Sequence, residues 1–507
     1  MINQQTINRS AYLRDCIKFH FLNKYEPEKK GESNSNEFVQ DSHKKAMSAA
    51  EVLFEGGQDL KHIAHKLGVT IAFATAQIIS SGQYGIYFHP EFYSVSENLS
   101  AYADILIITE MERRIIRVKS STKIKEPQYI DEVGFIYRIS QEYSNLRKAK
   151  FFIYTLNKEY KLGEELDAED LFQIKDVTNK ARLNQPEITK RLKEIRDIVG
   201  NKDKNKATQV KMGRQCETPF RCPYFDHCSK ALQPTAIEKI ESLTKPQLEY
   251  LQEMGVEHVT EIPYGFRLSP KQRTEVDAVT QGRLHINRKQ LEEFFLKVDA
   301  SGPVTFLDFE TEISSVPKYP GTHPYQKIPF QFCCLFRASL NASYERYEFI
   351  AQPGIDPRRK FIVSLIDELN KTSGPIMVYS ETFEKTILQQ LGQIFPEYFD
   401  NIQLILNRIV DLCKPFKERS FYHPRFRGRY SLKIVYPVLY PSTDYKRLAI
   451  QDGLQASHAY SQYPSLPDEK KMQTINDLRT YCYIDVLAMV RVLDVLYSHY
   501  LKNSKFK

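Results

Sequence analysis

Two acidic residues stand two positions apart inside a short apolar run. Asp308 and Glu310 belong to the stretch PVTFLDFE, residues 303–310, which reads as a β-strand. Side chains at i and i+2 of a strand leave the same face, so both carboxylates would lie together among apolar neighbours. Such a pair is costly to bury unless a cation compensates it. Acids placed in this way can hold two metal ions for in-line attack on a phosphodiester.

Two later stretches add further acids to the same half of the chain. Residues 378–384, VYSETFE, read as a strand end followed by a helix start, which brings Glu384 beside an aromatic ring. Near the C-terminus, Tyr481 and Asp485 stand at i and i+4 of a predicted helix and therefore share one face. An aspartate in that position can bind a metal ion while the tyrosine hydroxyl orients the attacking water.

These three motifs, in this order, resemble the DEDD-type 3′–5′ exonucleases, which have an RNase H-like fold and include polymerase proofreading domains. The resemblance implies that Mg²⁺ or Mn²⁺ is bound by four acids and that Tyr481 orients water. The four implied ligands are Asp308, Glu310, Glu384 and Asp485. The second motif departs from the family pattern N-x-x-F-D, because Ser380 replaces the Asn and Glu384 the Asp. Asp411, in the stretch IVDL, is the alternative ligand.

A basic segment precedes the last helix. Residues 414–433, KPFKERSFYHPRFRGRYSLK, carry seven Lys or Arg against one Glu, interleaved with Phe and Tyr. Cations neutralise phosphates and aromatic rings stack on bases, so Arg425, Arg427 and Arg429 are candidate nucleic-acid contacts. A solvated loop with a few buried aromatic residues is the other interpretation.

Four cysteines form a second set of candidate ligands. Cys216, Cys222 and Cys228 are separated by five residues each, and Cys16 lies far upstream. Zinc sites usually contain closer pairs, although His227 keeps zinc possible, and unligated buried thiols are a further alternative. One distant cysteine plus a late triple resembles the iron–sulfur staple of RecB-like and CRISPR-adaptation nucleases. The resemblance implies that the four thiolates bind a [4Fe–4S] cluster.

Between these cysteines the chain resembles a PD-(D/E)XK nuclease core. The family pattern is Asp followed by Glu-x-Lys, for which this chain offers Asp104, Arg117 and Lys119. A guanidinium cannot bind a cation, and Ile136 occupies the place of an expected Gln in the following helix. His43 loosely matches an accessory ligand. We therefore expect a degenerate site that keeps the nuclease fold without cleaving.

The whole chain resembles an uncharacterised bacterial family that fuses a RecB-like iron–sulfur nuclease domain to a DEDD-type exonuclease domain. The matching stretches are residues 16, 53–54, 56–57, 103–106, 118–122, 216–228, 306–311, 323–331, 421–424, 430–433, 452–453 and 481–489. The resemblance implies that Gln331 and Lys433 lie near the exonuclease site, with Lys433 contacting phosphate.

Length and composition set the general class. A chain of 507 residues exceeds what one hydrophobic core usually supports, and 42% hydrophobic with 26% charged residues is ordinary for a globular protein. The net charge of +8 is weak evidence for a nucleic-acid partner. We expect no membrane segment and, because the N-terminus is too polar for a signal peptide, a cytoplasmic protein.

Three domains of an α/β protein are predicted. Residues 1–230 form the RecB-like domain, residues 231–297 a helical linker, and residues 298–507 the RNase H-like domain. Within the linker, residues 248–259 resemble half of a helix–hairpin–helix, although a helical spacer ending at Gly255 explains them equally well. In the last domain we expect strands at 303–310, 330–337, 375–379 and 404–412, and helices at 360–370, 383–390 and 472–496.

Three interpretations of function remain open. The first is a metal-dependent 3′–5′ exonuclease acting on nucleic acid, with DNA favoured over RNA and the N-terminal domain binding the strand. The second is a non-catalytic nucleic-acid-binding subunit of a repair or defence complex with protein partners, in which both sites are degenerate. The third keeps both nuclease domains active.

Overall fold

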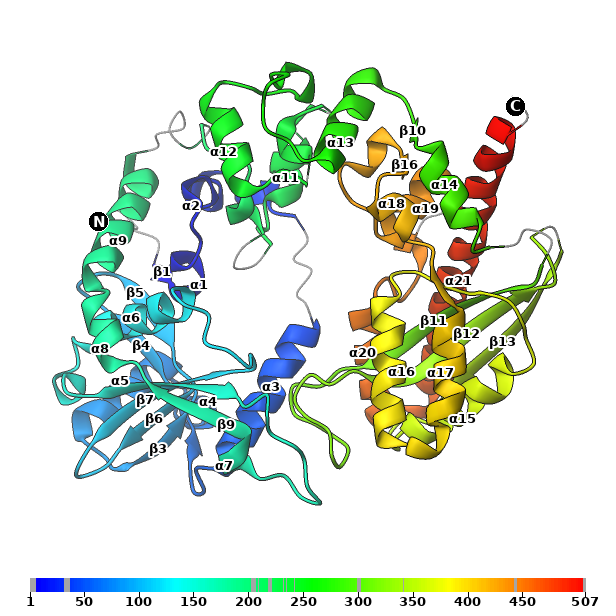
Figure 1. The fold of residues 1–507 in the computed structure, drawn as a ribbon. Coiled ribbons are helices and arrows are strands. Elements are labelled where there is room, and N and C mark those ends of the chain that lie inside the picture. Colours follow the sequence, from blue (N-terminus) through cyan, green and yellow to red (C-terminus); the bar gives the residue numbers. More distant parts are fainter. Residues whose placement is uncertain are drawn as a thin grey trace. The chain divides into compact units, whose positions relative to one another are not determined.

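Two mixed β-sheets, each with helices on both faces, organise the chain in the computed structural model (Figure 1). The predicted α/β class is confirmed at this level. The structure describes residues 6–31, 37–201, 207, 209–217, 221–230, 232–233, 235–240, 242–298, 302–340, 342–441 and 445–504. Unit 1 comprises Met1–Leu232 and Ser314–Gln326, and unit 2 comprises Gln233–Ile313 and Lys327–Lys507.

Unit 1 is built on a six-stranded sheet with the strand order β2-β3-β6-β7-β8-β9. The strands are β2 (Gln58–Asp59), β3 (Gly85–Phe88), β6 (Ile105–Ile108), β7 (Arg113–Lys119), β8 (Lys150–Leu156) and β9 (Phe172–Asp176). The central β6 and β7 are antiparallel, whereas β7 and β8 are parallel. Alternate residues of these strands face opposite sides, so both faces carry an apolar core.

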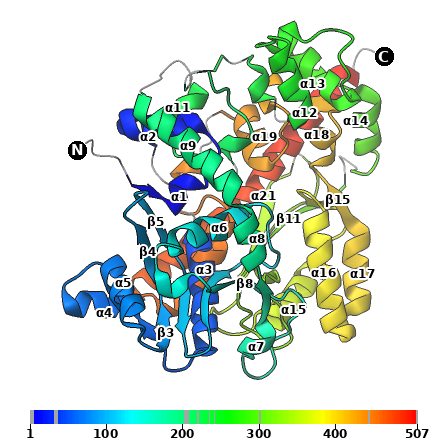
Figure 2. The ribbon, with the colours of Figure 1, turned by 90° about the vertical axis from the view of Figure 1, so that its left-hand side faces the viewer.

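Helices cover both faces of this sheet (Figure 2). On one face, α6 (Gln128–Ser140) packs against Ile115 and Phe151. On the other, the small residues of α3 (Glu37–Val52) pack against Ile116 and Val118. A second sheet joins β1 (Ile7–Asn8), β5 (Leu99–Tyr102) and β4 (Glu91–Ser94).

The segment Ser314–Gln326 belongs to unit 1, although it follows a strand of unit 2 in sequence. The Ser315 hydroxyl donates to the Ser42 carbonyl oxygen at 2.9 Å, and the Tyr325 hydroxyl donates to that of Ser120 at 2.7 Å. The backbone of Leu162 exchanges hydrogen bonds with Gly321 and Thr322. Sequence reasoning placed this segment wholly within the last domain.

Unit 2 contains a five-stranded sheet of order β13-β12-β11-β14-β15. Its strands are β11 (Val304–Glu312), β12 (Ile328–Arg337), β13 (Tyr344–Ile350), β14 (Ile376–Val378) and β15 (Ile409–Asp411). The first three pair antiparallel, and β14 and β15 continue the sheet parallel to β11. β11 is therefore the central strand, and it is buried from both sides.

Alternation along β11 divides the core of unit 2 into two layers. Phe306 points to the face covered by α21 (Asp468–Ser504), together with Val486 and Met489 of that helix. Leu307 and Phe309 point to the opposite face. That face is covered by α15 (Arg358–Leu369), α16 (Thr382–Ile394) and α17 (Phe399–Arg408).

Most predicted elements of this sheet are present, with one error and one omission. Residues 404–412 were predicted to be one strand, but α17 continues to Arg408 and only Ile409–Asp411 are extended. The helical spacing of Ile402 and Ile405 buries both side chains, whereas Leu404 is 62% exposed, a pattern that a strand cannot produce. The strand β13 was missed because its alternating charges hide the apolar face.

The helical stretch after residue 233 folds with the five-stranded sheet in unit 2. Its main helices are α12 (Lys245–Glu253), α13 (Pro270–Gln281) and α14 (Arg288–Phe295). Glu275 of α13 is fully buried and accepts a hydrogen bond of 2.6 Å from Arg419 Nε. Gly428 packs tightly beside this ion pair, because a Cβ on Gly428 would lie only 2.9 Å from the backbone nitrogen of Ser242. This ion pair joins α13 to the basic segment.

Among the described residues, no single helix is long and apolar enough to cross a membrane. Together, α4 (Leu60–Leu67) and α5 (Ile71–Ser81) reach the required length and composition, with a bend of 101° between them.

The buried ion pair predicts a specific stability change. Glu275→Gln leaves the buried Arg419 guanidinium without a counter-charge, so the free energy of unfolding should fall by about 3 kcal/mol. The matched control is Lys271→Ala, which breaks the exposed 2.9 Å pair between α13 and Glu418 and should cost less than about 1 kcal/mol. Urea titration followed by far-ultraviolet circular dichroism measures both. Equal losses in the two variants would contradict the role assigned to the buried pair.

Candidate metal centre

The central strand positions the first two acids. Asp308 and Glu310 lie opposite Cys333 and Gln331 of β12, and their alternation with Phe309 directs them toward the α21 side of the sheet. The pairing shifts register directly after Glu310. Such a bulge bends a strand and re-aims the side chains beside it, and bulges are frequent next to active sites.

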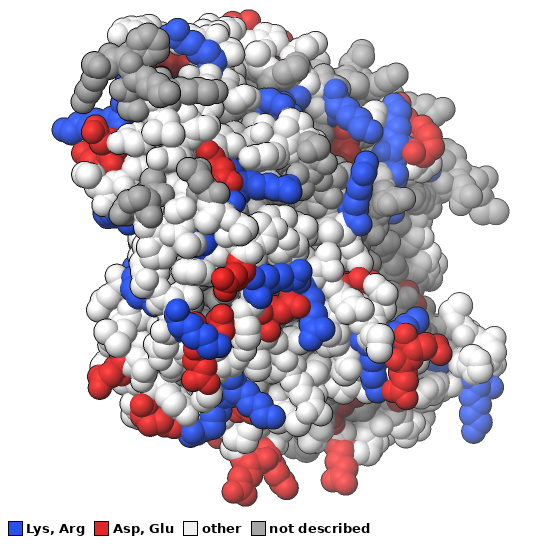
Figure 3. All heavy atoms as spheres, turned by 90° about the vertical axis from the view of Figure 1, so that its right-hand side faces the viewer, with Lys and Arg blue, Asp and Glu red and all other residues white. Residues whose placement is uncertain are grey.

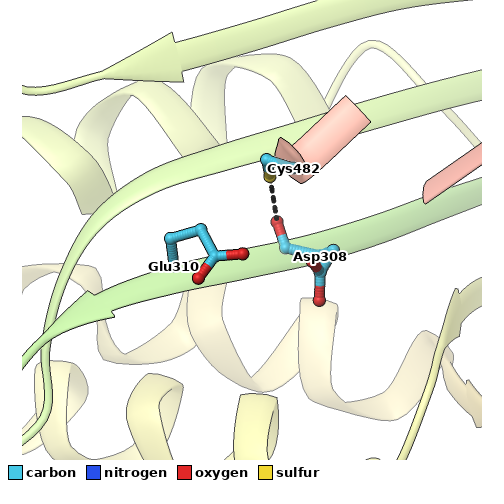
Figure 4. Close-up of side chains that lie close together, drawn as sticks. All are labelled: Asp308, Glu310 and Cys482. Carbon is cyan, nitrogen blue, oxygen red and sulfur yellow. Dashed lines mark hydrogen bonds between the residues drawn. The ribbon is translucent and has the colours of Figure 1, made fainter. Parts of the chain in front are cut away.

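Three potential ligand groups come together here. One carboxylate oxygen each of Asp308 and Glu310 and the Cys482 sulfur lie within 4.8 Å of one another (Figure 4). The Cys482 thiol donates a weak 3.9 Å hydrogen bond to the backbone carbonyl oxygen of Asp308, which ties α21 to β11. Cys482 was not among the predicted site residues, although it immediately follows Tyr481.

Asp485 of α21 lies near these acids, although it is not in the group whose ligand atoms lie within 4.8 Å of one another. Its side chain is buried, and its charge contributes to raising the pKa of Asp308 and of Glu310 well above their ordinary values. Burial is the larger cause in both cases. Burial also raises the pKa of Asp485 itself, although Lys433 and two tyrosine hydroxyls act against the shift. The three carboxyl groups therefore resist ionising together without a cation.

Tyr481 is held by a lysine. Lys433 Nζ, on α19 (Leu432–Leu439), donates to the Tyr481 hydroxyl oxygen at 2.7 Å and to the Gln451 carbonyl oxygen at 2.6 Å. Burial, followed by the charges of Asp485 and Glu310, raises the pKa of Tyr481 far above its usual value. The phenol therefore stays protonated. Its oxygen accepts a hydrogen bond from Lys433, so the hydroxyl proton points away from Lys433.

Glu384 and Asp411 have different surroundings. Glu384 lies in the first turn of α16, is buried, and its pKa is raised well above the ordinary value by burial and then by Asp308. One Asp411 oxygen accepts backbone hydrogen bonds from Ser380 and Cys413, both at 2.9 Å. Ser380 has φ +77, a left-handed conformation that few residues other than glycine adopt, so Asp411 supports a strained turn. Glu384 is thus freer to bind an ion.

Buried acceptors without partners test whether a metal ion fits. Glu384 Oε2 and Asp485 Oδ1 have no hydrogen-bond partner within the part of the chain that the structure describes. The same holds for the Gln331 amide oxygen beside Glu310. Buried oxygen atoms are normally satisfied, and hard oxygen donors are what Mg²⁺ and Mn²⁺ prefer. The donor set fits such an ion.

Another helix approaches Glu310 from its N-terminal end. A Cβ on Gly453, the first residue of α20 (Gly453–Gln462), would lie 3.7 Å from Glu310 Oε2. The preceding Asp452 caps that helix by accepting from the Gln455 amide, and its charge further raises the pKa of Glu310. Sequence reasoning noted residues 452–453 only as a match to a family and gave Asp452 no role.

The candidate nucleic-acid contacts fall into two groups. Gln331 is fully buried, and its amide donates to the Leu478 carbonyl oxygen at 3.0 Å, so it supports α21 and has no exposed surface for a ligand. Arg425 and Arg429 are exposed, and Arg427 is half-buried. Their exposure is compatible with the predicted phosphate contacts.

The aromatic residues of the basic segment do not serve as predicted. Four of its rings are buried in the core of unit 2, which agrees with the alternative interpretation of that segment. They are Phe416, Phe421, Tyr422 and Phe426. A ring without an exposed face cannot stack on a base, so the expectation that these aromatics contact nucleic acid is wrong.

The four predicted cluster cysteines gather in unit 1. Cys16, Cys222 and Cys228 belong to one apolar cluster. Burial, then the nearby thiols of Cys216 and Cys222, raises the pKa of Cys16 to about 11. No three of the four sulfur atoms lie within 4.8 Å of one another. Thiols that lie near one another are soft donors, which iron–sulfur clusters and Zn²⁺ both bind.

A closed network of ion pairs surrounds Asp104, Arg117 and Lys119 of unit 1, where a degenerate nuclease site is expected. Arg117 Nη1 lies 2.6 Å from Asp104 Oδ2, and its Nη2 lies 2.8 Å from Glu132 Oε1. Glu132 also pairs with Arg9 at 2.8 Å and with Lys119. Although burial acts in the opposite direction, these cations hold the pKa of Asp104 and Glu132 well below ordinary values. The negative charges of both acids are therefore already compensated by cations of the protein.

Other contacts complete this network. His43 Nε2 lies 3.6 Å from Asp104 Oδ1, which accords with its loose match to an accessory position. Glu132 was missed by sequence reasoning, because the family pattern places the second acid on the strand. One signal was present: Glu132 stands four residues before Ile136, on the helix face where the missing Gln was sought.

Comparison with known proteins adds little. A family model described as a domain of unknown function (DUF2779) matches residues 305–431. The matched region contains Asp308, Glu310, Glu384 and Asp411, and it ends before Lys433, Tyr481 and Asp485. No curated protein matches the chain.

Proposed function

We propose that unit 2 is a metal-dependent 3′–5′ exonuclease that hydrolyses nucleic acid, with DNA favoured over RNA. The observation that carries the proposal is the approach of Asp308 and Glu310, whose carboxylate oxygens lie within 4.8 Å of each other, with Asp485 near enough for its charge to help raise the pKa of both. Mutually repelling buried acids are unfavourable for folding and are retained where they bind cations. Glu384 is the fourth proposed ligand.

The protein groups around the acids have distinct tasks in this proposal. Bound Mg²⁺ or Mn²⁺ would stabilise the charge that develops on the phosphoryl oxygens. Tyr481, held by Lys433 and kept protonated, orients the attacking water through its hydroxyl. Lys433 lies close enough to lower the pKa of all three acids. Its ammonium group can therefore also contact the scissile phosphate. The polarity of attack rests on the family resemblance.

The same proposal gives fold assignments to both units. In unit 2, three antiparallel strands continued by two parallel ones support an RNase H-like domain with its acids on the central strand. In unit 1, the mixed sheet with Asp104 directly before β6 and Lys119 at the end of β7 supports a PD-(D/E)XK-like domain. Unit 1 would bind the strand and not cut it, because Arg117 takes the position that a metal ion needs.

A second candidate is a non-catalytic nucleic-acid-binding subunit of a repair or defence complex. The Arg117 network favours this role for unit 1 taken alone. The unpartnered acid oxygens of unit 2 favour the exonuclease for the whole chain. On the face drawn in Figure 3, Lys and Arg are interspersed with Asp and Glu, so that face offers no broad basic area for strong electrostatic binding.

A [4Fe–4S] cluster bound by Cys16, Cys216, Cys222 and Cys228 belongs to the proposal as a structural element of unit 1. Cys16 is at the start of the unit, and the other three cysteines are near its end. Thiolate bonds to one cluster would therefore join the two ends of the unit and restrict its unfolded state.

Removal of one charge tests the catalytic proposal. Asp308→Asn keeps the side-chain shape but lowers cation affinity, so hydrolysis of end-labelled single-stranded DNA in Mg²⁺ or Mn²⁺ should fall by about a thousandfold or more. Tyr481→Phe should slow the reaction by about tenfold to a hundredfold, because orientation of water is only part of the barrier. Product ladders on denaturing gels report both rate and polarity.

The unit 1 variant Lys119→Ala is the control for that experiment. If Arg117 has replaced the metal ion, Lys119→Ala should leave the cleavage rate within about twofold of the original. A hundredfold loss in Lys119→Ala with full activity in Asp308→Asn would place the chemistry in unit 1 and contradict the proposal.

The second motif offers a choice between two ligands. Glu384→Gln should reduce cleavage by about a hundredfold or more, because its unpartnered oxygen is the one free to bind an ion. Asp411→Asn should retain activity within about tenfold, since an amide oxygen can still accept from the Ser380 and Cys413 amides. The reverse order of losses would assign Asp411 as the ligand and Glu384 as its support.

The cysteines predict colour and metal content. Anaerobically purified protein should be brown, with iron and acid-labile sulfide near about four per chain. Cys222→Ser should bleach the protein and lower the melting temperature of unit 1, whereas Cys413→Ser, a buried cysteine of unit 2, should keep the colour. A colourless protein with stoichiometric zinc would contradict the cluster.

A further inference from the structure

The exposed aromatic residues of unit 2 include a group on its helical segment, away from the buried rings of the basic segment. Tyr250 on α12 is 55% exposed, and Tyr264 in the connection to α13 is 93% exposed. The Tyr250 and Phe266 rings stack with centroids 6.1 Å apart and planes at 18°. Large apolar surface left in water is unfavourable, so an exposed pair of this kind indicates a contact with a partner.

Tyr250 and the half-buried Phe266 line a groove of about 930 Å³ between the starts of α12 and α13. Arg267 is the single charged side chain that lines it. The remaining lining residues are Thr244, Pro246, Gln247, Tyr250, Phe266, Leu268, Ser269 and Gln272. Arg267 is exposed, and no acidic side chain lines the groove. The lining thus combines flat rings with positive charge.

Side-chain hydrogen bonds hold the groove rigid. The amides of Gln247 and Gln272 donate to each other, at 3.3 and 2.9 Å, and each side chain also caps its own helix. Arg273 donates to the carbonyl oxygens of Tyr264 and Phe266, both at 3.0 Å. Its guanidinium also lies 5.6 Å from the centroid of the Tyr264 ring. A platform fixed in advance loses little entropy when a ligand binds.

The starts of the two helices are related in sequence as well as in space. Leu243-Thr244-Lys-Pro-Gln247 and Leu268-Ser269-Pro-Lys-Gln272 share the pattern Leu, hydroxyl residue, Pro and Lys in either order, then Gln. Both form capping boxes, and the two Gln side chains meet. Sequence reasoning found no repeat here. The groove is thus formed by two copies of one helix start, and a stacked ring from each side borders it.

We propose that this groove binds unpaired nucleotides of single-stranded nucleic acid, with a base stacked on Tyr250 and Phe266 and a phosphate near Arg267. Every base has a flat π-face, so aromatic platforms with a nearby arginine bind single strands without reading sequence. An amphipathic helix of a protein partner would need a longer aliphatic lining than the single Leu268 provides. The inference rests on the proposed function only for the class of ligand.

Binding without cleavage tests the groove separately from the metal centre. Fluorescence anisotropy with a dye-labelled oligothymidylate in EDTA gives the Kd while divalent ions are absent. Tyr250→Ala should raise the Kd by about tenfold, and Tyr250→Phe should restore it because the ring and not the hydroxyl carries the contact. Arg267→Ala should raise the Kd by about fivefold and reduce its dependence on salt.

Matched controls separate stacking from loss of folding. Phe399→Ala removes a ring of 50% exposure on α17 and should leave the Kd and the melting temperature unchanged. A duplex of the same length has its bases already stacked, so its Kd should respond to Tyr250→Ala by less than about twofold. An unchanged Kd in Tyr250→Ala, an equal loss on the duplex, or no binding by the original protein would each overturn the proposal.

Asp308→Asn separates this inference from the proposed function. In EDTA it should bind the oligothymidylate at least as tightly as the original protein, since removal of a negative charge does not weaken attraction for phosphate. If Asp308→Asn still cleaves while Tyr250→Ala loses binding, the proposed metal centre fails and the groove stands. If Asp308→Asn abolishes cleavage while Tyr250→Ala binds normally, the groove fails and the metal centre stands.

Discussion

Asp308, Glu310 and Asp485 place three carboxyl groups in one poorly hydrated volume between a central strand and the C-terminal helix. Burial raises the free energy of each charge, and each charge raises that of its neighbours. The surrounding structure holds the groups in this unfavourable arrangement. Hydrogen bonds of Cys482 and Gln331 tie α21 to the sheet. Lys433, bonded to Tyr481, supplies a positive charge near the acids. A divalent cation is the simplest compensation for what remains.

Unit 1 compensates buried acids in a different way. Asp104 and Glu132 pair with the guanidinium of Arg117, which cannot be a ligand itself and compensates their charge directly. Both acids are held ionised, whereas the acids of unit 2 are held toward their neutral forms. The sign of the pKa shift therefore distinguishes an acid pair that the protein has neutralised from one that still requires a cation. By this criterion, the acids of unit 2 still require a cation and those of unit 1 do not.

The two kinds of aromatic residue also separate by what surrounds them. The rings of the basic segment lie in the core beside α13, α18 (Lys414–Lys417) and α21, where the Arg419–Glu275 pair fixes the chain path. They hold Lys433 and its neighbours in place. Tyr250 and Tyr264 remain exposed and Phe266 half-buried on a rigid support, and exposure is the property that stacking on a ligand requires. Composition alone cannot separate these roles.

Local patterns in the sequence were sufficient for the strands and helices that carry the acids. The apolar run around Asp308 specifies a strand, and period-two alternation puts Glu310 on the same face. The spacing of Tyr481 and Asp485 specifies one face of a helix for the same kind of local reason. Strand 404–412 failed because a short apolar run does not distinguish a helix end from a strand.

Only the tertiary structure decided which distant residues share a site. Glu132 comes to Arg117 through packing of α6 on the sheet, and Cys482 comes to Asp308 through packing of α21. It also shows how Glu384 and Asp411 differ, because Glu384 is buried with an unpartnered oxygen and Asp411 supports a backbone turn. Periodicity acts over a few residues, whereas burial and charge compensation depend on neighbours that the chain brings together from far apart.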